Sequence, residues 1–403
     1  MDVIRRIQEF NAGRDPERLS LKYERMRSSS FGFLRATCHL FYEQLLATGL
    51  FKSAPLTWIC GDLHLENFGS YKGNNRLTYF DLNDFDEAAL APASWELVRM
   101  LTSLLVGAES LSIKPLEART LCSVFLDSYA STLSTGKAYW IESETAQGIV
   151  RKLLIGLRDR QRANFLNSRT VLKGKKRALR VDGKRALPVS NAQRKAVVDF
   201  MARFAKAQSQ PEFFKVLDVA RRIAGTGSLG INRYAILVAG KGSPDGNFLL
   251  DLKQALGSSV ATHLQSLQPK WRSEAHRIVE IQRRMQAVSV ALLQPVRFDE
   301  GSYVIRELQP LEDRVSLDQT HETADKLELV VNNMGQLLAW AHLRSAGRQG
   351  SAIADDLIAF GLRKKWKAKL LVTARSCASQ VKKDAITFNA SYDAGEFKLG
   401  QAI

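Results

Sequence analysis

Apolar residues in the first third of the chain recur mainly at helical spacing. Between residues 19 and 50 they surround an irregular SSSFGF stretch, which predicts one or two short helices. Residues 95–135 predict a pair of buried helices. Between these regions, the runs TWICGDLHLENFG and RLTYFDLNDF flank a polar KGNNR segment. This pattern predicts extended segments that enter a hairpin, and both arms of the hairpin carry carboxylates.

The pattern becomes strand-like in the middle of the chain. Residues 211–256 contain three apolar, β-branched runs separated by a glycine-rich turn and a KGSPDGN loop, which predicts a three-stranded meander. Residues 273–293 predict a helix, YVIRELQPL a strand, and 321–346 a long helix that ends near Gly347. Residues 351–403 predict a terminal helical segment with a frayed tail. The chain is therefore expected to be of the α+β class.

Length and composition exclude several classes of protein. A chain of 403 residues with 45% hydrophobic residues is too long and too apolar for a peptide, a disulfide mini-protein or a disordered tail. The cysteines are scattered without CxxC spacing, which argues against a zinc ribbon or a disulfide framework. No apolar run approaches the roughly 18 residues of a membrane span, and the N-terminus lacks a signal-peptide core. We therefore expect a cytoplasmic protein with reduced thiols.

The net charge of +17 is regional rather than uniform. Residues 151–195 carry a local charge of +13, and residues 361–383 contain basic residues but no acid. A basic segment of this kind suits nucleic acid or another polyanion, although LKGKKRALRVDGKR contains no aromatic residue to stack on bases. The interpretation favoured by the sequence is a solvated basic hairpin, and polyanion binding is the alternative.

The strongest chemical signal is the carboxylate pair in the predicted hairpin. Asp62 is followed five residues later by Asn67, and Asp84 lies on the second arm. A proton acceptor and oxygen ligands in this arrangement suit Mg²⁺, which takes one or two carboxylates, a neutral oxygen and substrate phosphates. For any one of these residues, a simple turn-forming role is the competing interpretation.

A second signal is the GxGxxG pattern formed by Gly225, Gly227 and Gly230, with Ser228 inside it. Glycines let backbone N–H groups approach phosphate oxygens. A dinucleotide fingerprint opens a helix, whereas a kinase-type loop joins two strands. The run NRYAILVAG follows, which favours the hairpin. Lys253 then sits in an alternating strand, either exposed to solvent or aimed at a nucleotide's phosphates.

These motifs support a family resemblance. CGDLHLENFG followed by DLNDFDEA resembles the GDLHxxN and IDF(D/G) motifs of aminoglycoside phosphotransferases. The order of these motifs with ARRIAGTGSLG, LLDLKQA, RIVEIQRRMQ and LLAWAHLRSAG is similar to the bacterial DUF2252 family, an uncharacterised group related to the protein-kinase-like superfamily. The resemblance spans roughly residues 20 to 350.

The resemblance implies specific roles. It makes Asp62 the catalytic-loop carboxylate and Lys253 the strand lysine on the α- and β-phosphates. The implied Mg²⁺ ligands are Asn67 and Asp84, and the implied phosphate-covering loop contains Gly225, Gly227, Ser228 and Gly230. For the helix partner of Lys253, the resemblance points to Glu280, whereas the apolar face of the helix is centred on Glu274.

The resemblance also implies a two-lobed, protein-kinase-like fold with a small antiparallel-sheet lobe and a larger helical lobe. Asp62 precedes Gly225, the reverse of the usual kinase order, so we expect a circular permutation. The expected parts are a helical catalytic lobe at 1–210, a nucleotide-binding lobe at 211–312, and helices at 313–403 that return to the catalytic lobe. Cys60 stands where kinases carry a bracing histidine, so another group must brace the loop.

The expected function is ATP-dependent phosphotransfer with Mg²⁺ to a hydroxyl group of a small molecule. Nucleotide transfer would use nearly the same residues. The alternative is a nucleotide-binding pseudokinase or adaptor whose basic segment binds a polyanion.

Overall fold

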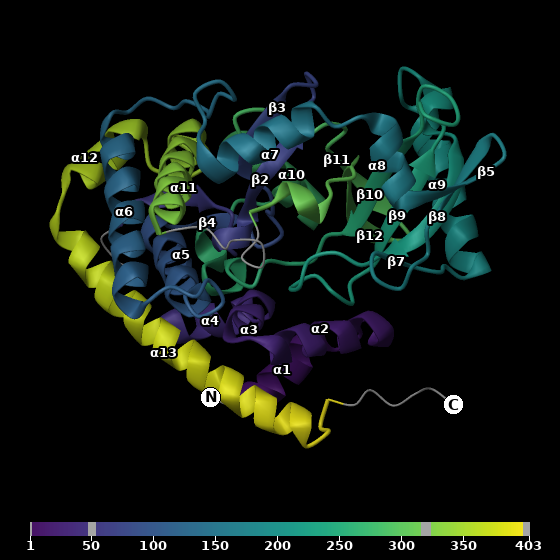
Figure 1. The fold of residues 1–403 in the computed structure, drawn as a ribbon. Coiled ribbons are helices and arrows are strands. Elements are labelled where there is room, and N and C mark those ends of the chain that lie inside the picture. Colours follow the sequence, from purple (N-terminus) through teal and green to yellow (C-terminus); the bar gives the residue numbers. More distant parts are fainter. Residues whose placement is uncertain (1, 47–53, 316–323, 398–403) are drawn as a thin grey trace.

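The computed structural model describes residues 2–46, 54–315 and 324–397, and it confirms the α+β class (Figure 1). Four short helices begin the chain, and the side chains of Asp2, Asp15 and Ser29 cap the first three by accepting backbone N–H groups. They are α1 (Val3–Asn11), α2 (Pro16–Ser28), α3 (Ser30–Ala36) and α4 (Cys38–Leu46).

The predicted hairpin follows these helices. Strand β2 (Phe68–Lys72) pairs with β3 (Thr78–Leu82), and β1 (Leu56–Ile59) pairs with β4 (Ala89–Pro92), both antiparallel. The short helix η1 (Leu65–Asn67) leads into β2. The loop after β1 and the loop after β3 lie next to one another, because Asn67 at the end of η1 donates to backbone carbonyl groups of both.

A helical layer packs around these strands. The helices that contribute most to the core of this layer are α5 (Ala93–Gly107), α6 (Pro115–Ser134), α11 (Ala324–Ser345) and α13 (Lys365–Asp393). Figure 1 shows α13 running along the outside of α6 and α5. The smaller helices are α7 (Gly148–Arg158), which contacts β2 and β3, and α12 (Ala354–Leu362), which contacts α6. Among the described residues, no helix combines the length and apolar character that crossing a membrane requires.

The second unit is a six-stranded antiparallel sheet with the order β11-β12-β10-β9-β8-β7. The predicted meander is confirmed, since β8, β9 and β10 are neighbours. The strands are β7 (Ala186–Leu187), β8 (Val216–Arg222), β9 (Arg233–Val238), β10 (Phe248–Gln254), β11 (Gln294–Phe298) and β12 (Gly301–Glu307). Helix α9 (Asn191–Lys206) covers one apolar face, so the chain before residue 211 also contributes to this unit.

The remaining elements surround the sheet. Helix α10 (Glu274–Met285) packs against β11 and β12. Helix α8 (Arg162–Arg169) and the hairpin of β5 (Thr170–Lys173) and β6 (Lys176–Leu179) belong to the basic segment. The short helices are η2 (Pro211–Phe214), η3 (Ala261–His263), η4 (Gln265–Leu267) and η5 (Leu311–Asp313).

The face of the sheet opposite α9 carries a buried charge cluster. Asp251 of β10 is fully buried and forms ion pairs with Arg233 at 2.6 Å and Arg222 at 2.7 Å. Arg306 of β12 lies 3.7 Å from the same carboxylate. Burial opposes ionisation of Asp251, but the arginines outweigh it and hold the pKa of Asp251 well below its usual value. The sheet therefore keeps a net positive face.

Replacing Asp251 with asparagine should destabilise the fold by about 3 kcal/mol, because three buried guanidinium groups lose their shared counter-charge. Urea unfolding of Asp251→Asn against the parent protein measures this loss. Asp199→Asn is the matched control, since Asp199 pairs with Lys195 on the exposed surface of α9 and should cost less than about 0.5 kcal/mol. Equal stability of the two variants would contradict the expected role of Asp251.

Candidate active site

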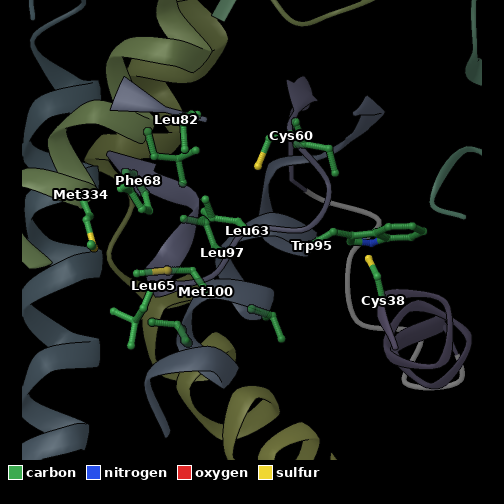
Figure 2. Packing of buried hydrophobic residues seen from close by; sticks show 14 of the residues in the cluster. Cys38, Cys60, Leu63, Leu65, Phe68, Leu82, Trp95, Leu97, Met100 and Met334 are labelled. Atoms are coloured by element: carbon green, nitrogen blue, oxygen red, sulfur yellow. The ribbon is translucent and has the colours of Figure 1, made fainter. Parts of the chain in front are cut away.

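The Asp62 loop has a backbone that only glycine can provide at one position. Gly61 has φ +85°, and a Cβ atom there would lie 2.1 Å from the carbonyl oxygen of Glu87. The neighbouring side chains Leu63 and Leu65 are buried, and Figure 2 shows them beside Leu97 and Met100 of α5. Because these apolar side chains are packed in the core, the polar side chains between them can line the cavity that lies next to the core.

A buried carboxylate braces this loop through its backbone N–H groups. Oε1 of Glu96 accepts the backbone N–H groups of Cys60 at 2.7 Å and Gly61 at 3.2 Å. Its other oxygen lies 3.1 Å from Nε2 of His342 on α11, and the Tyr42 hydroxyl donates to the Gly61 carbonyl. Glu96 and Tyr42 therefore hold the backbone directly before Asp62.

Asp62 has one oxygen engaged and one left for a ligand. Arg99, which is fully buried on α5, donates from Nη2 at 2.6 Å and from Nε at 3.1 Å, both to Oδ1. Within the described part of the chain, Oδ2 of Asp62 accepts no hydrogen bond, and the side chain is 22% exposed. Burial raises the pKa of Asp62, and Arg99 opposes that rise.

Asn67 connects the loop that contains Asp62 to the acidic loop that contains Asp84 and Asp86. Its Nδ2 donates to the carbonyl oxygens of Asp62 at 3.3 Å and Asp84 at 3.2 Å. Its Oδ1 accepts the N–H groups of Asp84 at 2.7 Å and Asn83 at 3.3 Å. The side chain is buried, so this cross-link fixes the backbone of Asp62 relative to that of Asp84.

The structure brings Lys253 to these loops from a distant part of the sequence. Its Nζ contacts Oδ2 of Asp86 and lies 3.7 Å from Oδ1 of Asp84. Lys253 is buried on β10, while both carboxylates are about one-third exposed. Burial would raise the pKa of Asp84, but Lys253 and nearby arginines lower it below its usual value. Asp84 therefore stays ionised beside a fixed cation.

The residues present fit Mg²⁺ in part. Asp84 offers a carboxylate beside an open cavity, and Mg²⁺ commonly takes one or two carboxylates with phosphate oxygens and water. The amide oxygen of Asn67 is already occupied by two N–H groups, so in this position it acts as a cross-link. Among the described residues, no group of three or more His, Cys, Asp or Glu side chains is arranged to hold a metal. A bound metal would thus need oxygens from its ligand.

A cavity of about 140 Å³ joins these residues to the glycine-rich loop. Gly225, Thr226, Gly227 and Ser228 line it, whereas Gly230 ends the loop with φ +90°. The charged side chains that line the cavity are Asp62, Asp84, Asp86, Glu87, Arg14, Arg35 and Arg314. His64 also lines it and caps η1 by accepting the Glu66 N–H at 3.1 Å. The loop joins two strands, β8 and β9, as the hairpin interpretation expects.

The structure does not bring Glu280 to Lys253. Glu280 is 41% exposed and pairs with Arg283, one turn further along α10. Glu274 is equally exposed and pairs with Arg277. The residue of α10 that does reach the acidic loop is Arg277, which donates to the backbone carbonyls of Asp86 at 2.9 Å and of Ala88. On the inward face of α10, the guanidinium group of Arg277 therefore contacts the backbone of the acidic loop.

Three arginines that lie near the acidic side chains were not predicted from the sequence motifs. Arg99 holds Asp62, Arg35 pairs with Glu66, and Arg314 lies close enough to Asp84 for the two charges to interact. Burial lowers the pKa of Arg314 to about 10, while Asp84 opposes that shift. The available signal for Arg99 was a charge that stands, with Glu96, in the otherwise apolar helix WELVRMLTSLLVG. No local pattern marks Arg35 or Arg314.

The basic segment folds over a second cavity of about 290 Å³. Arg169, Arg180 and Arg185 line one side, and apolar residues of the sheet and the segment after β12 line the other. Those apolar residues include Ala235, Leu249 and Leu308. Arg314 lines both cavities, and Ala224 of the second cavity precedes Gly225 of the first. The basic segment is therefore not simply a solvated hairpin, although its tip at 173–176 is exposed.

Comparison with known proteins gives one result. The model of a family described as uncharacterised proteins conserved in bacteria, DUF2252, matches residues 14–391. The chain belongs to the DUF2252 family. The match covers the loops around Asp62 and Asp84, the glycine-rich loop and Lys253, as well as the helices that surround them. No curated protein and no solved structure matches this DUF2252 chain.

Proposed function

We propose that this DUF2252 protein is a Mg²⁺-dependent, ATP-using phosphotransferase that acts on a hydroxyl group of a small molecule. One observation carries the proposal: Lys253 pairs with Asp84 and Asp86, and these two carboxylates line, together with Asp62, a cavity bounded by the glycine-rich loop. Phosphoryl transfer needs positioning and charge stabilisation more than covalent chemistry, and these residues supply both.

Each of these residues would have a separate role in the reaction. Lys253 and Arg314 would neutralise phosphate charge, and Asp84 would hold Mg²⁺, which supplies charge stabilisation at the transferred group. Oδ2 of Asp62 would accept the proton of the acceptor hydroxyl while Arg99 holds Oδ1. The acceptor oxygen forms the new bond to the γ-phosphorus, the bond to the β,γ-bridging oxygen breaks, and ADP leaves.

The second cavity supports a site for the base of the nucleotide. Its apolar wall includes Ala235 of β9, Leu249 of β10 and Leu308 after β12, and Arg314 lines both this cavity and the cavity beside Asp84. Planar bases favour apolar walls, while phosphates favour cations and free N–H groups. An extended nucleotide with its base in the second cavity would thus direct its phosphates toward Lys253.

We also propose that the fold is a circularly permuted version of the protein-kinase-like fold. The sheet elements β8 to β12, with α10 between β10 and β11, follow the order glycine loop, lysine strand, helix and two further strands. The Asp62 and Asp84 loops precede them in the chain instead of following them. The contact of Lys253 with Asp84 and Asp86 supports this arrangement, because side chains from a reversed chain order meet in space.

The test is a thermal-shift and titration panel of ATP, GTP, ADP and adenosine, each with and without Mg²⁺. The proposal predicts a metal-dependent rise in melting temperature with a nucleoside triphosphate and weaker shifts with adenosine. Labelled ATP with a metabolite mixture then identifies the acceptor. Binding without any turnover, unchanged by Asp62→Asn, would instead favour a nucleotide-binding adaptor. The absence of any nucleotide-dependent shift at millimolar ligand would contradict the proposal.

A further inference from the structure

The backbone carbonyl groups of the glycine-rich loop are held by the N-terminal helices. Arg25 of α2 donates to the Gly225 oxygen at 2.6 Å. Arg14 donates from Nη1 to the oxygens of Gly227 at 2.8 Å and Leu229 at 3.1 Å. Nζ of Lys22 lies 3.2 Å from the same Gly227 oxygen. The loop therefore has its carbonyl oxygens occupied by cations that come from residues 14–25.

Two further contacts show that the N-terminal segment fits the loop closely. The N–H of Asp15 donates to the Gly230 oxygen at 2.8 Å, and the Asp15 carboxylate pairs with Arg221 of β8 at 2.8 Å. A Cβ atom at Gly230 would lie 2.8 Å from the Cβ of Arg14. In Figure 1, α2 extends from the helical layer toward the side of the molecule that carries the sheet. The helix thus connects the two units at the loop.

The N–H groups of the same loop remain available. Within the described part of the chain, the backbone N–H groups of Gly225, Thr226, Gly227 and Ser228 make no hydrogen bond. These four residues line the cavity that contains Asp84. Consecutive free N–H groups form a concave site for an anion, and a cation on the carbonyl of a peptide group polarises its neighbouring N–H. Because the carbonyl groups of the loop are engaged and its N–H groups are free, the loop favours a phosphate group on its cavity side.

The positive charge of Lys22 and Arg14, which hold the glycine-rich loop, points to an anionic ligand. Lys22 is fully buried, and among the described residues its Nζ donates hydrogen bonds to Oδ1 of Asn11 at 2.7 Å and to the Gly227 oxygen, and lies over the Phe10 ring. Neither Lys22 nor Arg14 forms an ion pair with a carboxylate among the described residues. Burial without a counter-charge disfavours the charged forms, so it lowers the pKa of Arg14 and holds that of Lys22 well below its usual value. A polyphosphate across the loop would supply that charge.

We propose that Arg14, Lys22 and Arg25 are positioning residues for nucleotide phosphates, because they hold the glycine-rich loop with its carbonyl groups engaged and its N–H groups free. The inference rests on the proposed function and extends the phosphate site to helix α2 and the turn before it. It assigns these residues to phosphate binding alone, with no part in binding the base.

The test compares the dissociation constants of MgATP and adenosine, by calorimetric titration, for the parent protein, Lys22→Met and Arg14→Gln. MgATP affinity should fall about tenfold in each variant, which corresponds to about 1.4 kcal/mol, while adenosine affinity stays within about twofold. Arg27→Gln is the control on the same helix, since Arg27 pairs with Asp393 at the surface. Thermal unfolding confirms that each variant is folded, and Arg25→Gln replaces any variant that is not.

The outcomes separate the two proposals. Folded variants that bind MgATP as tightly as the parent protein would overturn the positioning role and leave the proposed function intact. A parent protein that binds MgATP no better than adenosine would overturn the proposed function itself. A parallel loss of MgATP and adenosine affinity in the variants would also overturn the inference, because a general disturbance of the fold moves both.

Discussion

Asp62→Asn should lower Mg²⁺-dependent ADP formation by about a hundredfold or more while MgATP affinity changes by less than about threefold. Asparagine keeps an oxygen for Arg99 but replaces the open Oδ2 by an NH₂ group, which cannot accept a proton from the acceptor hydroxyl. The loop should keep its shape, because Glu96 and Tyr42 hold it through the backbone.

Initial-rate measurements of ADP formation and a separate MgATP titration check this result. Asp159→Asn is the control, since Asp159 is exposed and pairs with Arg158. Full turnover in Asp62→Asn would remove Asp62 from the reaction. Loss of binding together with turnover would place Asp62 in nucleotide recognition instead of proton transfer.

Lys253→Met should have the second large effect, a loss of about a hundredfold in turnover combined with weaker MgATP binding. The substitution keeps most of the side-chain volume and removes the cation that faces Asp84 and Asp86. Two carboxylates would then face the phosphates without compensation. The pKa of Asp84 should rise, because Lys253 is the leading group that lowers it.

The same pair of assays measures this variant, with Lys195→Met on the exposed surface of α9 as the control. The two active-site variants should differ in kind, since Asp62→Asn affects turnover alone and Lys253→Met affects both turnover and binding. If Lys253→Met behaved like Lys195→Met, the contact between Lys253 and the acidic loop would be structural only.

The sequence was sufficient to predict features that depend on local signals. The alternating strands on either side of the glycine-rich loop define the meander, and the structure contains it as β8, β9 and β10. Turn residues and strand runs likewise predicted that Asp62 and Asp84 lie on two arms of one hairpin region, and Asn67 connects them. Each of these features follows from periodicity within about ten residues.

Features that depend on packing between distant elements could not be predicted in this way. The amphipathic pattern of α10 offered Glu280 and Glu274, yet both lie at the edge of the buried face and Arg277 points inward. Its direction is set by how α10 packs on β12, which no single segment encodes. The same holds for the loop contacts of Arg14 and Lys22, which join residues more than 200 positions apart.

A crystal structure of the protein with Mg²⁺ and a non-hydrolysable ATP analogue tests the central claim most directly. The account predicts the metal on Asp84, phosphate oxygens within ion-pair distance of Lys253 and hydrogen-bonded to N–H groups of residues 225–228, and the base in the cavity lined by Leu249 and Leu308. A nucleotide bound at another surface, with Lys253 still paired to Asp86 in an empty cavity, would contradict it.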